Sequence, residues 1–290
     1  MMDDQKKYFK RNEQDFLRDA FWKKGKDYNI TKEEHYVNAI DKAFNDINVR
    51  TLTVIDKKQT GKDRKNKFYK DSEIVKTLYE YIHNGIGDNF ESFDDWHKNT
   101  CNKIQEDLSK HYEGVKYGKA QKFLNMSFKY LYCFDDIDDK IKEKFIPCHI
   151  VLDSYILNWV KSDVLSWYNN KLENEEKTKI QISLINDKYT WSNLESGDIE
   201  KEYSYQWFQN IIRKYLKENY LSHSYKTEDN KPLTPFEAEF YIWPEQQWKE
   251  ASQKLLSLKE SMIALASQYN LENFDEIFNM INEINSKLKF

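Results

Sequence analysis

The chain has 290 residues, of which 32% are charged and 16% aromatic, and its formal net charge at pH 7 is −4. Seven glycines and four prolines leave few breaks, so we expect a mainly helical fold rather than a turn-rich sandwich or barrel. The acidic balance argues against a wholly basic nucleic-acid binder, and neither GxGxxG nor GxxxxGK(S/T) occurs, which argues against a nucleotide cofactor.

Targeting and metal-binding signals are also sparse. No apolar run reaches the roughly 18 residues of a membrane-spanning helix, and the first ten residues are charged, so we expect a cytoplasmic protein without a membrane partner. The three cysteines, Cys101, Cys133 and Cys148, lie far apart and form no CxxC pair. We therefore expect no disulfide framework, no metal and no other cofactor.

The N-terminal half alternates predicted helices with charged connections. Residues 1–48 are expected to be helical, and Arg50–Ile55 is the best strand candidate. Lys57–Lys70 carries seven Lys or Arg against one Asp, and we interpret it as a solvated loop. Further helices are predicted from Ser72 to His83 and, after Ser92 as a cap, from Phe93 to Tyr112.

The C-terminal half contains a clearer helical pattern. Gln121–Phe134 is apolar nearly all round, which is typical of a buried helix. An extended segment, Phe145–Leu152, is followed by a helix that Asp153 caps and that runs through Leu172. The remaining predicted helices are Tyr203–Tyr220, Gln246–Tyr269 and Phe274–Leu288, with a capping box at Thr234–Glu237 as a further start signal.

A short glycine-containing turn precedes the buried helix. Gly114 and Gly118 let the backbone turn tightly, and amides at the start of the following helix favour an anion such as a DNA phosphate. Lys116 and Lys119 add positive charge to the same place. The alternative is an ordinary turn between two helices.

A polar strip runs down the buried helix. Asn125 and Lys129, three and seven residues after Lys122, fall on the same face as that lysine. A buried polar group must be paired or functional, and desolvation lowers the pKa of a lysine amine, which favours nucleophilic attack. The alternative is that Lys122 extends to the surface and Asn125 bonds a loop carbonyl.

Asp153 stands where the apolar segment Ile150–Leu152 turns into a helix. Aspartate is among the best N-caps, so a purely structural role is a strong alternative. A carboxylate at a helix N-terminus also stays ionised, and it can stabilise positive charge on a sugar ring or orient a nucleophile.

This arrangement resembles the helix-hairpin-helix DNA glycosylases, and most closely their archaeal 8-oxoguanine DNA glycosylase branch. Lys122 matches the nucleophilic lysine, Lys129 the second lysine, and His149–Asp153 (HIVLD) the strand that ends in the catalytic aspartate. The turn glycines are displaced from the family pattern, which leaves Lys119 as the alternative nucleophile.

The sequence contains no internal repeat and no clear linker, so we expect a single compact unit over 1–290. The resemblance implies a hairpin and catalytic core at 110–165 and C-terminal helices at 203–290. It implies a helix-hairpin-helix element and at most a few short strands. Lys122 would attack the sugar C1′ of a flipped nucleotide and Asp153 would assist, with Asn125, Lys129 and His149 in support. The partner would be DNA, either a duplex with a damaged or modified base or a single strand, and the protein a monomer acting in repair or anti-phage defence.

Two readings without chemistry remain open. The chain would be either a glycosylase-like scaffold that binds DNA, or an interaction protein whose C-terminal helices dock a partner. A metal-dependent nuclease is disfavoured, because the acidic cluster Asp135–Asp139 has the pattern of a solvated loop.

Overall fold

The computed structural model describes residues 33–47, 52–133, 139–220, 225–227 and 229–269. Over these residues the protein is mainly helical with a few short strands, which confirms the expected fold class. The sequence predicts one unit over the whole chain, whereas the fold divides into two compact units, Met1–Trp243 and Pro244–Phe290. The predicted helices before residue 33 and at Phe274–Leu288 lie outside the described residues.

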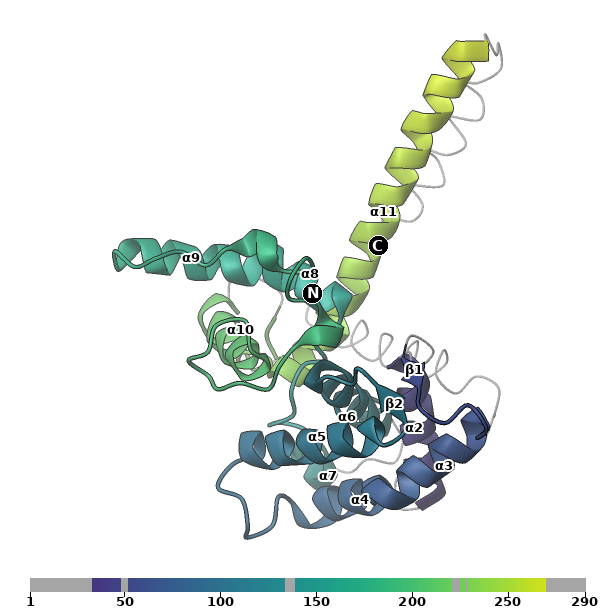
Figure 1. The fold of residues 1–290 in the computed structure, drawn as a ribbon. Coiled ribbons are helices and arrows are strands. Elements are labelled where there is room, and N and C mark those ends of the chain that lie inside the picture. The colour runs from purple at the N-terminus through teal and green to yellow at the C-terminus, as the bar shows by residue number, and fades with distance from the viewer. Residues whose placement is uncertain (1–32, 48–51, 134–138, 221–224, 228, 270–290) are drawn as a thin grey trace. The chain divides into compact units, whose positions relative to one another are not determined.

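The first part of the first unit consists of helices and one small two-stranded sheet that lies beside them (Figure 1). The helices are α2 (Glu33–Asp46), α3 (Gly61–Ser72), α4 (Ile74–Asn84), α5 (Phe93–Ser109), α6 (Tyr117–Tyr132) and α7 (Asp139–Glu143). Two strands, β1 (Thr53–Val54) and β2 (Tyr112–Glu113), pair antiparallel with Thr53 opposite Glu113. The predicted strand Arg50–Ile55 is therefore confirmed only at its centre.

The later elements include one interrupted helix and two short 3₁₀ turns. They are α8 (Ser154–Trp159), the π-helical turn η2 (Val160–Val164), α9 (Leu165–Asn174), η3 (Ile182–Leu184), η4 (Trp191–Asn193) and α10 (Tyr205–Asn219). The last helix, α11 (Pro235–Tyr269), crosses the boundary between the two units. In the second unit, Lys249 and Glu245 pair at 2.8 Å one turn apart on this helix.

Helix α6 forms the centre of the first unit. It packs most extensively against α2 and also contacts α5 and η4 (Figure 1). Apolar side chains such as Phe123, Leu124 and Phe128 are fully buried, each stabilising the fold by about 1.5–3 kcal/mol. Every residue of α6 except Lys122 is buried, as the apolar run predicted.

The solvated loop predicted at Lys57–Lys70 is wrong, because α3 occupies most of this segment. The Thr60 hydroxyl accepts a hydrogen bond from the Asp63 amide at 3.2 Å and caps the helix. Phe68 is fully buried, and its ring lies 5.5 Å from that of Phe123. A cap and an apolar anchor therefore outweigh the high charge of the segment.

The boundary expected at Ser72 also needs correction. Ser72 ends α3, and Glu73 adopts a left-handed conformation (φ 51°) that separates it from α4. The helix predicted over Phe93–Tyr112 is shorter, since α5 ends at Ser109 and Tyr112 belongs to β2. Its predicted cap is confirmed, because the Ser92 hydroxyl accepts a hydrogen bond from the Asp95 amide.

Two further predicted helix starts are confirmed, whereas α6 begins at Tyr117 instead of Gln121 and α10 at Tyr205 instead of Tyr203. Asp153 caps α8, and the helix continues through the π turn to Asn174, slightly beyond the predicted end. At the capping box, the Thr234 amide donates to the Glu237 carboxylate at 2.9 Å and the Glu237 amide donates to Thr234. The helix that begins there continues through Pro244, whereas the sequence predicted a new start at Gln246.

Candidate functional site

Two lysine side chains converge on one aromatic ring. The Nζ atoms of Lys119 and Lys122 lie 4.8 and 4.5 Å from the centroid of the Trp191 ring. The lysines are one turn apart in α6, and Trp191 opens η4, which contacts that helix. Cation–π attraction to the indole offsets part of the repulsion between the two ammonium groups.

The two lysines differ in their surroundings. Lys119 is buried and its Nζ donates to the Ile47 carbonyl at 3.0 Å. Burial lowers the pKa of Lys119, and the nearby charge of Lys122 lowers it further. Lys122 is half-buried, and among the described residues it forms no ion pair. Lys122 is therefore the more accessible amine of the pair.

The predicted glycine turn divides at the start of α6, because Gly114 precedes the helix and Gly118 lies in its first turn. Gly114 is exposed with φ +70°, and Lys116 is exposed at the N-cap of α6. Gly118 is buried and its amide donates to the Leu194 carbonyl at 3.1 Å. A Cβ at Gly118 would lie 1.8 Å from the Trp191 carbonyl oxygen, so this glycine permits the close approach of η4.

The Asp153 carboxylate accepts two hydrogen bonds at the start of α8. One carboxylate oxygen accepts the Ile156 amide at 3.0 Å, and the other accepts the Trp243 indole N–H at 3.1 Å. The residue is only 8% exposed, and the two hydrogen bonds fix the direction of its side chain. Asp153 is thus an N-cap, as its position predicted, and each of its carboxylate oxygens accepts a hydrogen bond.

Gln121 joins the segments that carry Lys122 and Asp153. Its amide group donates to the Leu152 carbonyl at 2.8 Å, and its side-chain oxygen accepts the Leu152 amide at 3.3 Å. The chain neighbours of the two predicted catalytic residues are therefore in direct contact. This connection spans 31 residues of sequence.

Asp46, at the end of α2, is the carboxyl group that the sequence reasoning missed. It accepts a hydrogen bond from the Tyr130 hydroxyl and interacts electrostatically with Lys122 and Lys129. Burial raises the pKa of Asp46, and the hydrogen bond and the lysines oppose that shift. A half-buried carboxyl with a raised pKa near an amine is suited to proton transfer.

Lys129, the second lysine of the predicted motif, is in a buried ion pair. Its Nζ lies 2.7 Å from Glu239 of α11, and both side chains are at most 4% exposed. The second oxygen of Glu239 accepts the Val151 amide at 2.8 Å. Lys129 thus helps to hold the extended segment before Asp153 through Glu239.

Asn125 and His149 belong to one buried hydrogen-bond chain. The Asn125 amide donates to the Tyr205 hydroxyl at 2.8 Å, and that hydroxyl lies 2.9 Å from Nδ1 of His149. Nε2 of His149 is 2.7 Å from Asp94, which Arg213 binds with two hydrogen bonds of 2.7 and 2.6 Å.

Burial and neighbouring charges shift the pKa values of His149 and Asp94 in this hydrogen-bond chain. Burial lowers the pKa of His149 to about 4, and Arg213 adds to the effect, although Asp94 opposes it. Burial alone would raise the pKa of Asp94, but His149 and Arg213 hold it well below its usual range. At neutral pH a neutral His149 therefore donates to Asp94 and accepts from Tyr205.

The extended segment that leads to Asp153 has no partner strand among the described residues. Its backbone is instead bound by buried side chains, because Gln209 donates to the Ile150 carbonyl at 2.9 Å while Glu239 and Gln121 bind the next two residues. Satisfying buried peptide groups in this way avoids the cost of leaving them unpaired.

No group of three or more His, Cys, Asp or Glu suited to a metal ion occurs within the described part of the chain. Within the same residues, no helix has both the length and the apolar character needed to span a membrane. Comparison with protein families, curated proteins and solved structures finds no match to this chain.

Sequence reasoning missed the residues that come to α6 from distant segments. They are Asp46, Trp191, Tyr205 and Glu239, which lie in α2, η4, α10 and α11. None stands in a motif or at a regular spacing from Lys122. For Glu239 a signal existed, because a buried Lys129 requires a carboxylate partner, although the sequence does not say which one.

Proposed function

We propose that the protein is a cytoplasmic, DNA-acting lysine enzyme, a DNA glycosylase with abasic-site lyase activity that excises a damaged or modified base. Lys122 is the nucleophile and Asp153 the assisting carboxylate. The observation that carries this proposal is the Gln121 bridge, which holds the residues preceding Lys122 and Asp153 in hydrogen-bond contact. The Trp191 ring over the lysine pair adds an apolar surface beside the reactive amine.

The chemistry assigns each group a defined task. Lys122 gives a proton to a carboxylate and its amine then attacks the sugar C1′. The bond to the base breaks, the base leaves with the bonding electron pair, and the new ammonium at C1′ passes a proton to the leaving base. Opening of the sugar ring yields a Schiff base, and loss of a C2′ proton then expels the 3′ phosphate. Water finally hydrolyses the Schiff base and regenerates the amine.

Two carboxyl groups are available for the charges and protons of this sequence. Asp153 is held by its two donors and offers negative charge to the cationic sugar. Asp46 interacts with Lys122 and is suited to accept its proton before attack. Exposed Lys116 and Gly114 stand at the same end of α6 for contact with DNA phosphates.

A second candidate is a DNA-binding or protein-interaction module without catalysis. It is favoured because polar groups near Lys122 already form hydrogen bonds within the protein. The Lys119 amine binds the Ile47 carbonyl, and both Asp153 oxygens accept internal hydrogen bonds. In this reading the lysine pair and Trp191 form a cationic, aromatic surface that stacks on bases.

Borohydride trapping separates the two candidates. The protein is incubated with duplexes that carry an abasic site, 8-oxoguanine, uracil or a modified cytosine, and the Schiff base is reduced to a stable adduct. We expect an adduct with the abasic duplex that is lost in Lys122→Gln, together with base release from one damaged duplex. Lys119→Gln tests the alternative amine, and Lys214→Gln is the control, because Lys214 is an exposed lysine of α10 with no role in the proposed site.

The outcomes are distinct. Loss of the adduct in Lys122→Gln, with a normal unfolding curve for that variant and a normal adduct in Lys214→Gln, supports the enzyme. Salt-dependent DNA binding that yields no adduct and no released base supports the binding module. No DNA binding even at low salt leaves only the interaction module.

A further inference from the structure

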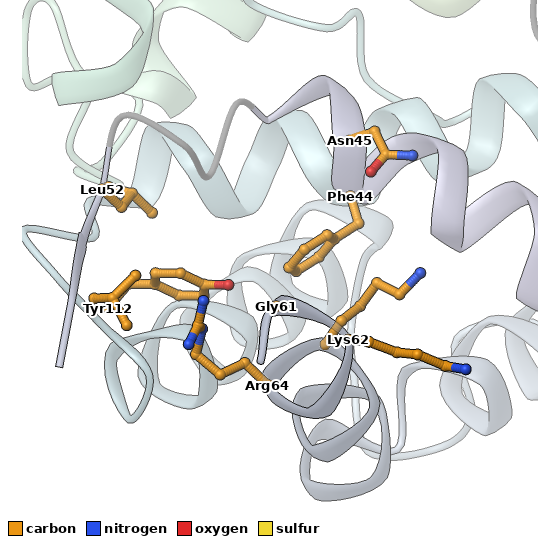
Figure 2. Close-up of a pocket in the computed structure, with 9 residues that line it drawn as sticks. Phe44, Asn45, Leu52, Gly61, Lys62, Arg64 and Tyr112 are labelled. Carbon is orange, nitrogen blue, oxygen red and sulfur yellow. The ribbon is translucent and has the colours of Figure 1, made fainter. Parts of the chain in front are cut away.

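A cavity of about 410 Å³ opens between α2, the small sheet and the start of α3 (Figure 2). Its apolar lining includes the rings of Phe44 and Tyr112 with Leu52 and Val54. The volume lies within the range of small-molecule sites, roughly 300–1,000 Å³. The cavity therefore has room for a planar organic group against two aromatic rings.

The charged side chains that line this cavity are all cationic. They are Lys62, Arg64 and Lys65 of α3, and no acidic residue joins them in the lining. Lys65 pairs with Asp41 at 2.9 Å, whereas neither Lys62 nor Arg64 forms an ion pair with another described residue. The local charge at the rim is therefore positive, although the chain as a whole is acidic.

Arg64 is held in place by the backbone rather than by a carboxylate. Its guanidinium donates to the carbonyls of Gln59 and Asp56, and it lies 6.0 Å from the Tyr112 ring centroid. Its Nε is buried without a hydrogen-bond partner in the described structure. A nearby anion would lower the cost of holding this charge out of water.

The backbone at the start of α3 also favours the binding of an anion. Gly61, the first residue of α3, lines the cavity, and the positive end of the helix dipole lies there. The Thr60 hydroxyl caps α3 by accepting a hydrogen bond from the Asp63 amide, so this cap does not bind the amides of Gly61 and Lys62. Apolar walls, a cationic rim and a helix start together match a ligand with a planar ring at one end and a phosphate at the other.

We propose that this cavity binds a nucleoside monophosphate, with the base beside Phe44 and Tyr112 and the phosphate near Lys62, Arg64 and the start of α3. Two sources share this chemistry, a free mononucleotide and the phosphorylated end of a nucleic-acid strand. The expectation of no nucleotide cofactor relied on the absence of a glycine-rich loop. A helix start flanked by cations binds phosphate without such a loop.

This site is separate from the lysine pair of the proposed function. The residues that line the cavity include neither Lys119 nor Lys122 nor Trp191, although Asn45 of the lining precedes Asp46, which interacts with Lys122. A loss of nucleotide binding and a loss of the borohydride adduct are therefore expected to come from different variants.

Isothermal titration with adenosine 5′-monophosphate tests the proposal, with adenosine, inorganic phosphate and a 5′-phosphorylated trinucleotide as comparison ligands. Asn45→Trp places a large side chain at an exposed position of the cavity wall and should abolish binding. Lys62→Gln should weaken it about three- to tenfold, the effect of one charge-assisted contact. Lys70→Gln is the matched control, an exposed lysine of α3 outside the lining.

Saturable binding of the monophosphate that Asn45→Trp abolishes and Lys70→Gln retains supports the site. Tighter binding of the trinucleotide identifies a strand end as the source, and equal or weaker binding identifies the free nucleotide. The proposal is overturned by the absence of binding at millimolar concentrations, by adenosine binding as tightly as its monophosphate, or by binding that Asn45→Trp and Lys62→Gln leave unchanged.

Discussion

The two ends of α6 use lysine differently. At the C-terminal end, Lys129 is buried with Glu239 at 2.7 Å, and the pair supports the backbone of Val151. At the N-terminal end, Lys122 is half-buried over the Trp191 ring and forms no ion pair with a described residue. Lys129 therefore has a structural role, whereas the Lys122 amine is accessible to a ligand.

This difference follows from solvation. A lysine that is withdrawn from water needs a buried acceptor, which is the Glu239 carboxylate for Lys129 and includes the Ile47 carbonyl for Lys119. A buried ion pair such as Lys129–Glu239 is sensitive to the loss of either partner. A half-buried lysine keeps contact with water and needs only weak compensation, here from an aromatic ring. We therefore expect substitutions at Lys129 to change stability and substitutions at Lys122 to change chemistry.

The largest expected effect is at Lys129. Lys129→Met leaves Glu239 buried without its cation and should lower the free energy of unfolding by about 3–5 kcal/mol. Lys122→Gln, the comparison variant, should lower it by less than about 1 kcal/mol. Urea denaturation measures both, and equal losses would remove the distinction between the two ends.

The hydrogen-bond chain that runs from Asn125, in the middle of α6, through Tyr205 to His149 provides a test by pH. Buried His149 has a pKa of about 4 in the folded protein against an ordinary value of 6.5, so the unfolded chain binds a proton first as the pH falls. Stability should therefore decrease from pH 6.5 to pH 4, by about 1.4 kcal/mol per pH unit and about 3 kcal/mol in total from this residue.

The control for this pH effect is His83, which is exposed in α4. The fall in unfolding free energy between pH 6.5 and 4 should be shallower in His149→Gln and unchanged in His83→Gln. The same slope in His149→Gln as in the unmodified protein would show that His149 does not stay neutral in the folded state.

A smaller effect is expected at the N-terminal end of α6. Gly118→Ala forces the Trp191 carbonyl away from the helix and should cost about 1–3 kcal/mol by overpacking. It should also reduce the yield of the borohydride adduct, because Trp191 would shift from the lysine pair. Gly114→Ala, where a Cβ meets open space but φ is +70°, should cost about 1 kcal/mol and leave the adduct intact. A Gly118→Ala protein of normal stability would contradict the close packing of η4.

The smallest effect is expected at a solvent-exposed pair. Lys171 and Glu218 lie 2.6 Å apart, and each side chain is 43% exposed. Water screens their attraction, so Lys171→Ala should lower the unfolding free energy by less than about 1 kcal/mol. A loss as large as that of Lys129→Met would show that burial does not decide the role of a lysine in this protein.

Local signals in the sequence predicted most of the helices. Ser92, Asp153 and Thr234 each cap the helix predicted to follow, because a cap depends on a few adjacent residues. The failure at α3 has a related cause, since the charge of Lys57–Lys70 hid the Thr60 cap and the single buried Phe68.

The candidate site was less accessible to sequence reasoning. The positions of Lys122, Asn125 and Lys129 on one helix followed from spacing, but their partners did not. Trp191, Tyr205 and Glu239 contact residues of α6 that lie at least 69 positions earlier in the chain (191 − 122 = 69 for Trp191 and Lys122), and no local pattern marks such contacts. Only the tertiary fold distinguishes a lysine with a buried partner from one without.

The proposed function depends above all on Lys122 being the reactive amine. After borohydride reduction on an abasic duplex, nuclease and protease digestion followed by mass spectrometry would locate the sugar remnant on the chain. We expect a modified peptide with the remnant on Lys122. A remnant on Lys119 or on an exposed lysine such as Lys116, or the absence of any modified peptide, would contradict this assignment.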